Sequence, residues 1–308
     1  MDVRHLELLR ELEARGSVSA VARATHRTVS AVSQQLRTAH RAFGIQLVEP
    51  DGRGIRLTDA GRLLAAGGAH VQTAMAQVQA DWDAYRHDPG GPVSVLAFPS
   101  AAGLLFPALA AGARGRGIEL SLSDVDPAEK DFASLSNDVD IAIAHSLAGP
   151  RPVGTGAMEV VELMAEPLDI AMAADHPLAN RRRLRADDVK DAAWIGVPRG
   201  YPFDTVMTSI AQKAGEPLAI EQRLHDNRVI EALVASSDRL AVLPRLTTPS
   251  GTGVVLREIT DVPARRFLSA VMRPDRARRL AVRNVLDLVI ECVRGVQSAS
   301  DARAASER

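Results

Sequence analysis

Residues 28–44, TVSAVSQQLRTAHRAFG, have the apolar spacing of an α-helix, but the opposite side lacks the Glu and Lys residues of a typical solvated helix. At 3.6 residues per turn, one stripe consists of Val29, Val32, Leu36, Ala39 and Phe43. A second stripe offers hydroxyl, amide and guanidinium groups: Ser30, Ser33, Gln34, Arg37 and Arg41. This second stripe either faces solvent on an ordinary globular domain or meets a partner rich in hydrogen-bond acceptors.

The residues before this stretch predict two further helices. Residues 2–15 have apolar positions on one helical face, and Gly16 ends that segment. Ser17 or Ser19 can cap a second, short helix, and Thr28 can cap the third through its hydroxyl. Three helices joined by short links, two of them by a tight turn, are typical of a helix-turn-helix.

A basic hairpin is expected next. Residues 45–48 and 55–57 are short strand-like runs around EPDGRG, which places Arg53 near the tip of a wing. From residue 23 to residue 62 there are seven arginines and three acidic residues. All but three of the 37 basic residues in the chain are arginine, so codon usage alone could explain part of this enrichment.

A long helix then connects this region to the rest of the chain. Thr58 can cap a helix from about residue 59 to residue 85, and an apolar row along it favours dimer pairing. The alternative is that this row packs on the chain's own second domain. The row consists of Leu63, Leu64, Val71, Met75, Val78 and Trp82.

The second part of the sequence alternates buried strands with helices. Runs such as VSVLAF, VDIAIAH and LDIAMAA are apolar throughout, which indicates parallel sheets covered by helices. We expect two α/β lobes separated by a crevice, with a strand near RRFLSAVM and the last helix returning to the first lobe. The predicted boundaries are 1–58 for the winged domain, 59–87 for the connecting helix, 88–92 for a hinge, about 93–162 and 268–295 for lobe I, about 163–267 for lobe II, and 296–308 for a flexible tail.

Composition excludes several classes of protein. The chain has 308 residues, 46% of them hydrophobic and 24% charged, with a formal net charge of -1. It contains no apolar run of bilayer length, and its lone Cys292 gives no intrachain disulfide, so we expect a cytoplasmic protein without a membrane partner. No nucleophile motif, metal motif or phosphate loop is present, which argues against an enzyme, and no metal or cofactor is expected.

At this point the sequence resembles a known family. Residues 16–61, GSVSAVARATHRTVSAVSQQLRTAHRAFGIQLVEPDGRGIRLTDAG, are similar without gaps to the winged helix-turn-helix of LysR-type transcriptional regulators, and DVDIAIAH, HPLA, AGEPLAIEQ and LAVLP follow in the family's order. The resemblance implies that residues 59–87 form a dimerisation helix and that residues 93–295 form an effector domain similar to periplasmic binding proteins.

The chain departs from the family pattern at several positions. Val29 replaces the usual Gln, so a base-reading amide is absent there, and His40 replaces the Glu that ends the recognition helix. Thr25, Val48 and Pro50 also differ from the usual residues. These differences predict an unusual operator preference rather than a different mode of docking.

The polar stripe of the opening helix fits the major groove, where side chains donate to and accept from base edges. We predict that Gln34 contacts an adenine edge and that Arg37 contacts a guanine edge or a phosphate. Arg53 can enter the minor groove or hold a phosphate, although any single arginine could equally be a solvated surface charge. The predicted DNA-binding residues are Arg27, Thr28, Ser30, Ser33, Gln34, Arg37, Arg53 and Arg56.

A small-molecule effector is expected where strand ends meet helix starts between the lobes. Arg199 or Arg228 could pair with a carboxylate, whereas Asp226 is equally suited to capping a helix. The predicted effector-binding residues are Ser100, Ala101, His145, Ser146, Arg199, Tyr201, Phe203, Thr205, Asp226 and Asn227.

The sequence therefore predicts a ligand-responsive transcription factor. Its expected partners are double-stranded DNA with an inverted-repeat operator, an unidentified small-molecule effector and further copies of itself in a homodimer or homotetramer; RNA polymerase is a possible partner. The alternatives are a DNA-binding protein whose second domain is vestigial or binds a partner protein, and, less favoured, a small-molecule binding protein or an enzyme.

Overall fold

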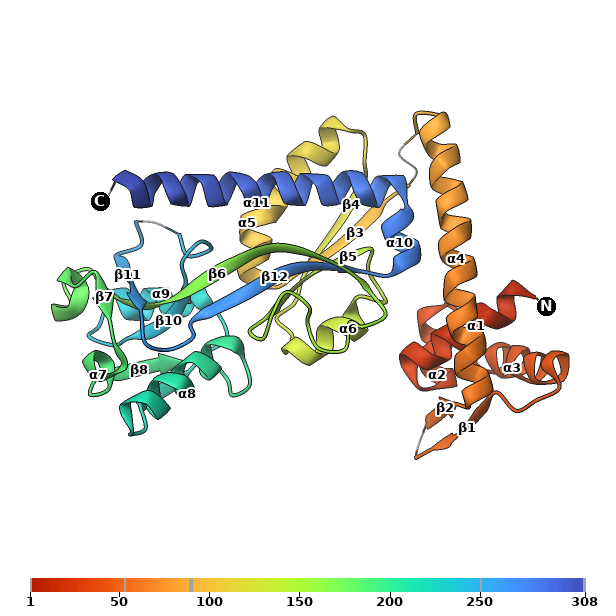
Figure 1. Ribbon diagram of the computed structural model, residues 1–308, viewed down its shortest axis with the longest axis horizontal. Helices are drawn as coiled ribbons and strands as arrows, with labels where there is room; N and C mark the ends of the chain where they lie inside the picture. Colours follow the sequence, from red (N-terminus) through yellow and green to blue (C-terminus); the bar gives the residue numbers. More distant parts are fainter. Residues whose placement is uncertain (1, 53, 89–90, 250, 307–308) are drawn as a thin grey trace.

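The computed structural model describes residues 2–52, 54–88, 91–249 and 251–306. Its N-terminal part is a winged helix-turn-helix, as predicted (Figure 1). The hydroxyls of Ser17 and Thr28 accept hydrogen bonds from the backbone N–H groups of Ala20 and Ala31, at 3.1 and 3.2 Å, and so start the second and third helices. The elements are α1 (Val3–Arg15), α2 (Val18–Ala24), α3 (Val29–Phe43), β1 (Val48–Asp51) and β2 (Gly54–Leu57).

The long helix α4 (Asp59–Tyr85) begins directly after the wing and extends well beyond the winged domain (Figure 1). Gly68 lies against α1: a Cβ added there would be 2.8 Å from the Cβ of Leu6, whereas one added at Gly67 would meet nothing within 4 Å. The small side of α4 therefore packs on its own domain. Large apolar side chains along α4 stay exposed: Leu63 75%, Met75 58%, Val78 70%, Trp82 53% and Tyr85 77%.

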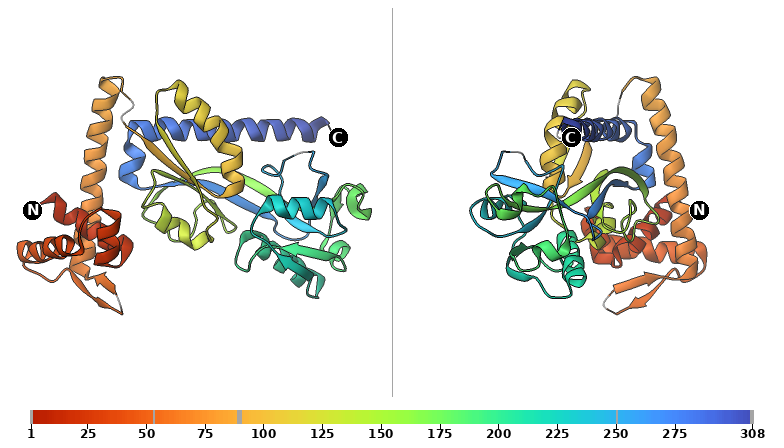
Figure 2. Two further views of the ribbon diagram at one scale, coloured as in Figure 1. Left: turned by 180° about the vertical axis from the view of Figure 1, so that it is seen from behind. Right: turned by 60° about the vertical axis from the view of Figure 1, so that its left-hand side comes forward.

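Lobe I is built on a mixed sheet. β3 pairs in parallel with β4 and β5, while β12 runs antiparallel to β5. Helices α5 and α11 pack together on this lobe, with Gly112 of α5 close to Leu288 of α11 (Figure 2). The main elements are β3 (Val93–Ala97), α5 (Pro99–Gly115), β4 (Leu120–Asp124), β5 (Ile141–Ser146), β12 (Arg265–Met272), α10 (Pro274–Arg278) and α11 (Leu280–Ser306); short helices lie at Glu129–Asp131 and α6 (Phe132–Leu135).

Lobe II surrounds a second apolar core that contains Trp194. It shares the long strand β6 with lobe I: one part of β6 pairs with β12, and the other part pairs with β10 and β11. The elements are β6 (Glu159–Ala173), a short helix at Pro177–Asn180, β7 (Arg183–Leu184), α7 (Ala186–Val189), β8 (Ala193–Gly196), α8 (Pro202–Ala214), β9 (Ala219–Arg223), α9 (Asn227–Ala235), β10 (Ala241–Pro244) and β11 (Val254–Ile259).

Two expectations from the sequence are wrong. The sheets are not purely parallel, because every described pairing of β6 and β12 is antiparallel. The segment after residue 295 is helical as far as Ser306, because its alanines extend α11 without having to nucleate a new helix. Within the described ranges, no helix combines the length and the apolarity needed to cross a membrane.

Candidate nucleic-acid interface and interlobe site

Helix α3 buries one side and exposes the other. Val32, Leu36 and Ala39 enter the apolar core of the winged domain. Val29, assigned to the apolar stripe from the sequence, is instead 51% exposed. The first turn of α3 projects beyond that core, where Thr28 and Ser30 are exposed as well.

The exposed side of α3 carries an internally bonded polar group. Arg37 donates from Nε and Nη2 to the amide oxygen of Gln34, at 3.1 and 2.5 Å. Both residues are exposed, as is Ser30, while Ser33 is half-buried. This contact uses the amide oxygen of Gln34 and not its NH₂ group, which can still donate to a base edge.

Neighbouring residues hold the predicted phosphate-contacting arginines. Arg27 donates to the amide oxygen of Gln35, whose NH₂ group donates to the carbonyl of Arg4 at 2.6 Å. On the wing, Arg56 pairs with Glu49 at 2.9 Å, and both side chains are well exposed. Arg53 lies outside the described residues.

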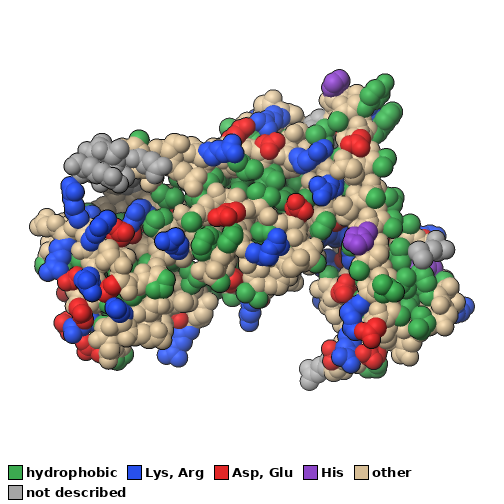
Figure 3. All heavy atoms as spheres, in the orientation of Figure 1, with side chains coloured by type: hydrophobic (Ala, Val, Ile, Leu, Met, Phe, Trp, Pro, Cys, Tyr) green, Lys and Arg blue, Asp and Glu red, His purple; other side chains and the backbone are tan. Residues whose placement is uncertain are grey.

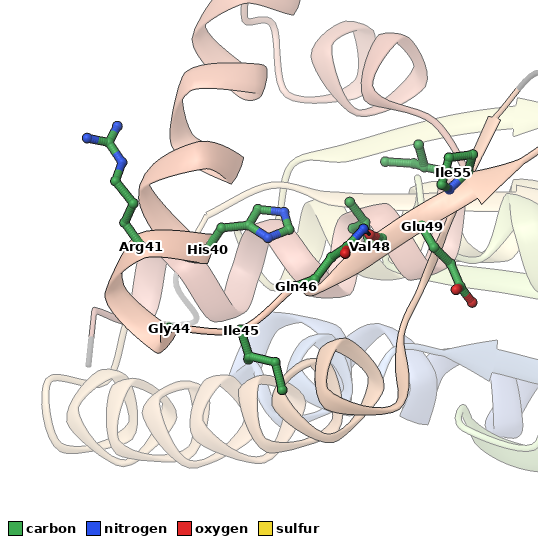
Figure 4. A pocket seen from close by; sticks show the side chains of 9 residues that line it. His40, Arg41, Gly44, Ile45, Gln46, Val48, Glu49 and Ile55 are labelled. Carbon is green, nitrogen blue, oxygen red and sulfur yellow. Dashed lines mark hydrogen bonds between the residues drawn. The ribbon is translucent and has the colours of Figure 1, made fainter.

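A pocket separates the end of α3 from the wing (Figure 4). His40 lines it, and its Nδ1 accepts a hydrogen bond of 3.3 Å from the backbone N–H of Leu47. Gln46 follows on the connection to β1, where its amide donates to the carbonyl of Val48 at 2.9 Å. His40 therefore holds the entry of the wing through a hydrogen bond accepted by its ring, at the position where the family resemblance leads us to expect a carboxylate.

Between the lobes, a buried arginine makes the most extensive set of polar contacts. Arg266, on β12, is 2% exposed and bonds Glu166 of β6 from Nε and Nη2, at 2.8 and 2.7 Å. Its Nη2 also lies 3.0 Å from the hydroxyls of Ser100 and Thr247. The other carboxylate oxygen of Glu166 accepts from the backbone N–H groups of Leu246 and Thr247, at 2.9 and 2.8 Å. One guanidinium thus ties the start of α5 to a lobe II connection.

Aromatic side chains surround this arginine. The Cζ atom of Arg266 lies 4.9 Å from the ring centroid of Phe98 and 5.6 Å from that of Phe203. His145, at the end of β5, lies 5.0 Å from the rings of Phe98 and Phe132. Among the described residues, its buried Nδ1 has no hydrogen-bond partner. Burial, reinforced by the charge of Arg266, lowers the pKa of His145 to about 3, so the ring is neutral at physiological pH.

We call the following residues the interlobe site: Phe98, Ser100, His145, Glu166, Phe203, Thr247 and Arg266. Outside this set, Tyr201 donates from its hydroxyl to the carbonyl of Asp126 at 3.3 Å, which links the lobes. The sequence did not point to four members of this site: Phe98, Glu166, Thr247 and Arg266. The pattern RRFLSAVM predicted only a strand, and the partner of Arg266 is 100 residues away along the chain.

The remaining candidate effector residues have other environments. Ala101 is fully buried in the core of lobe I, and the hydroxyl of Ser146 accepts from the N–H of Ala148 at 3.2 Å. Asp226 caps α9, which Asn227 begins, by accepting from the N–H of Arg228 at 2.8 Å. Arg199, Thr205 and Arg228 are exposed. The described residues contain no group of three His, Cys, Asp or Glu arranged to hold a metal.

Comparison with known families covers both halves of the chain. Residues 3–62 match the bacterial regulatory helix-turn-helix protein, lysR family, and residues 86–293 match the LysR substrate binding domain. The transcriptional dual regulator GltC of Bacillus subtilis is 25% identical over 252 residues, which cover 80% of this chain and 82% of GltC. A hydrogen peroxide-inducible genes activator of Pectobacterium carotovorum is 22% identical over 96% of this chain and 98% of its own length.

Solved structures show the same fold. Full-length OxyR from Pseudomonas aeruginosa superposes with a TM-score of 0.63 at 18% identity, covering 94% of this chain and 98% of OxyR. Full-length CbnR in complex with its target DNA superposes with a TM-score of 0.51 at 17% identity, covering 95% of this chain and 100% of CbnR. The two matched domains include most of the chain and follow one another in the order that the geometry shows. This chain belongs to the LysR family of bacterial transcriptional regulators.

Proposed function

We propose that this LysR-family regulator reads a specific operator through the exposed side of α3. The main support for this proposal is the hydrogen-bonded pair of Gln34 and Arg37. The pair stands on a helix that is capped by Thr28 and fixed to the domain core by Val32 and Leu36. Arg27 and Arg56 would contact phosphates beside it, with Ser30 and Ser33 near the helix start. The complex of the similar CbnR with its target DNA supports this mode of binding.

We assign the interlobe site as the place of a small-molecule effector. Its groups come from both lobes and from the strand β12 that connects them, so a ligand there would favour one arrangement of the lobes over another. A solved regulatory domain of similar fold, that of CcmR, is described in complex with 2-PG. The role of this domain would then be to sense a ligand and not to catalyse a reaction. The protein would act in the cytoplasm, where the chromosome lies.

The exposed apolar row on α4 suits pairing of two copies (Figure 3). Pairing would place two recognition helices on one duplex, which fits an inverted-repeat operator bound by a dimer or a tetramer. The corresponding domains would be the winged domain at residues 1–58, the linker at residues 59–87, of which α4 forms Asp59–Tyr85, and the effector domain from residue 93. Residues 89 and 90 of the predicted hinge 88–92 lie outside the described residues.

The proposal is tested by footprinting on DNA that flanks the protein's own gene, followed by affinity measurements on the protected site and on a scrambled duplex. Gln34→Ala and Arg37→Ala should each cost about 1 to 3 kcal/mol on the protected site and less on the scrambled one. Arg239→Ala, which removes a partly exposed arginine of lobe II that pairs with Glu221, is the control. Equal losses on both duplexes would remove the base-reading assignment.

A further inference from the structure

A cluster of charged side chains joins the winged domain to the effector domain. We call it the α1–α10 cluster; its members are Arg10, Glu11, Arg15, Asp138, Arg273 and Asp275. Across the boundary, Arg15 lies 2.7 Å from Asp138, Arg273 lies 3.3 Å from Glu11, and Arg10 lies 3.5 Å from Asp275. Three separate ion pairs therefore connect α1 to lobe I.

The cluster is shielded from water more than an ordinary surface ion pair. Apart from Asp138, every side chain in it is less than one-fifth exposed, and Glu11 is 14% exposed. Burial raises the pKa of Glu11, but the hydrogen bond from Arg15 and the charges of Arg273 and Arg10 more than offset this and hold it below its ordinary value. Glu11 is therefore ionised and held by three guanidinium groups, a geometry that screening by salt weakens little.

Two adjacent strands lead from this cluster to the interlobe site. Asp138 lies just before β5, whose other end carries His145. Arg273 directly follows β12, whose other end carries Arg266. The two strands pair in antiparallel register, for example Leu268 with His145 and Val271 with Ala142. A shift of Arg266 or His145 along its strand would therefore reach the cluster through a stiff, hydrogen-bonded ribbon.

We propose that the α1–α10 cluster is a latch that docks the DNA-binding domain on its own effector domain, and that β5 and β12 connect the latch to the interlobe site. The latch uses α1 and leaves the exposed side of α3 free, so it fixes where the recognition helix stands relative to lobe I. The role of the latch in a response to an effector rests on the proposed function, whereas the docking of the two domains does not depend on it. An effector that moves Arg266 or His145 would alter docking by favouring one of two arrangements.

Hydrogen–deuterium exchange of the α1 amides in the full chain tests the latch without DNA or effector. Both substitutions of the variant Asp138→Asn/Arg273→Gln are on the effector domain, so α1 itself is unchanged. We expect exchange in α1 to be roughly 5- to 30-fold faster than in the wild type, the range for a loss of one to two kcal/mol. Asp138→Glu, which keeps the charge, should exchange like the wild type.

Glu221→Gln is the control, because it removes the negative charge of a 2.6 Å ion pair with Arg239 that lies wholly inside lobe II, where the two side chains are 36% and 44% exposed. Unchanged exchange in α1 for the double variant, with its melting temperature intact, would overturn the latch. Acceleration of α1 exchange by Glu221→Gln to the same extent would overturn it too, because the effect would then be general destabilisation.

Ser100→Ala tests the connection to the interlobe site, because it removes an acceptor of Arg266. Introduced into the wild-type chain, Ser100→Ala should change the exchange rate of α1 by about twofold or more. Introduced into Asp138→Asn/Arg273→Gln, it should leave that rate unchanged, and this departure from additivity indicates coupling. Additive effects would overturn the connection and leave the latch. If α1 exchange responds as expected but no operator is protected in the footprint, the proposed function fails and the latch stands. If an operator is protected but α1 exchange does not respond, the latch alone is rejected.

Discussion

The Nη2 atom of Arg266 lies 2.7 Å from Oε2 of Glu166, and the two residues are register partners on the paired strands β12 and β6. Both side chains are almost completely buried. Because the guanidinium and the carboxylate compensate each other, this pair gives the interlobe site no net charge. The pair also brings together the start of α5 and the connection after β10 through Ser100 and Thr247.

Arg266→Met should destabilise the effector domain by about 3 to 5 kcal/mol, because Glu166 would remain buried without its cation. The double variant Arg266→Met/Glu166→Gln should recover most of this loss, since it buries neither charge and keeps an acceptor for the N–H groups of Leu246 and Thr247. Chemical denaturation followed by tryptophan fluorescence measures both, because Trp194 lies in the lobe II core. Additive losses in the double variant would contradict the pairing.

Two adjacent glycines of α4 should respond in opposite directions to substitution by alanine. Gly67→Ala should stabilise by up to about 1 kcal/mol, because alanine favours the helix and its Cβ meets nothing. Gly68→Ala should destabilise, because its Cβ would lie 2.8 Å from the Cβ of Leu6 and 3.1 Å from the carbonyl oxygen of Leu6. Thermal unfolding of the two variants side by side tests this. A higher melting temperature for both variants would contradict the close contact between Gly68 of α4 and Leu6 of α1.

His145 should make stability depend on pH. The pKa of this residue is about 3 in the folded chain against an ordinary 6.5, so between these values the unfolded chain binds a proton that the folded chain does not. The free energy of unfolding therefore falls as pH drops below 6.5, by about 1.4 kcal/mol per pH unit from this residue. His145→Phe, which cannot titrate, should show a shallower loss between pH 6.5 and 5.5. Parallel profiles for the two proteins would reject the assignment.

Glu49→Gln should strengthen binding to every duplex. The carboxylate of Glu49 holds Arg56 at 2.9 Å on the wing and would itself repel phosphates. Its removal should raise affinity by up to about fivefold, the range of an exposed ion pair, and should steepen the salt dependence. Binding measured against salt concentration tests this. Glu258→Gln, whose partner Arg183 lies in lobe II, should leave the salt dependence as it is.

Most of the winged domain could be predicted, because its signals are local; the first wing strand is the exception, since it was predicted at residues 45–48 and lies at Val48–Asp51. Thr28 caps α3, and Gly44 ends it with a φ of 67°, as the sequence indicated. The exposure of Val29 could not be predicted in this way, since periodicity gives the face of a residue but not how far the neighbouring core extends along the helix.

The interlobe site was less accessible to sequence reasoning. Ser100, His145 and Phe203 follow strands or begin helices, positions that a general rule for α/β folds identifies. Arg266 is next to the exposed Arg265, and the choice between them depends on pairing with a strand far away in the sequence. Strand direction in β6 and β12 was missed for a related reason: a strand buried on both faces has the same composition in either direction.

The exposed row on α4, with Leu63, Met75, Val78, Trp82 and Tyr85, also bears on how the folded chain depends on its own abundance. If a second copy covers this row, association removes apolar surface from water only in the folded state. Folding and association then form one equilibrium governed by mass action, and the melting temperature rises with protein concentration. The number of copies per cell would in that case set not only how much operator is occupied, but also how stable each copy is.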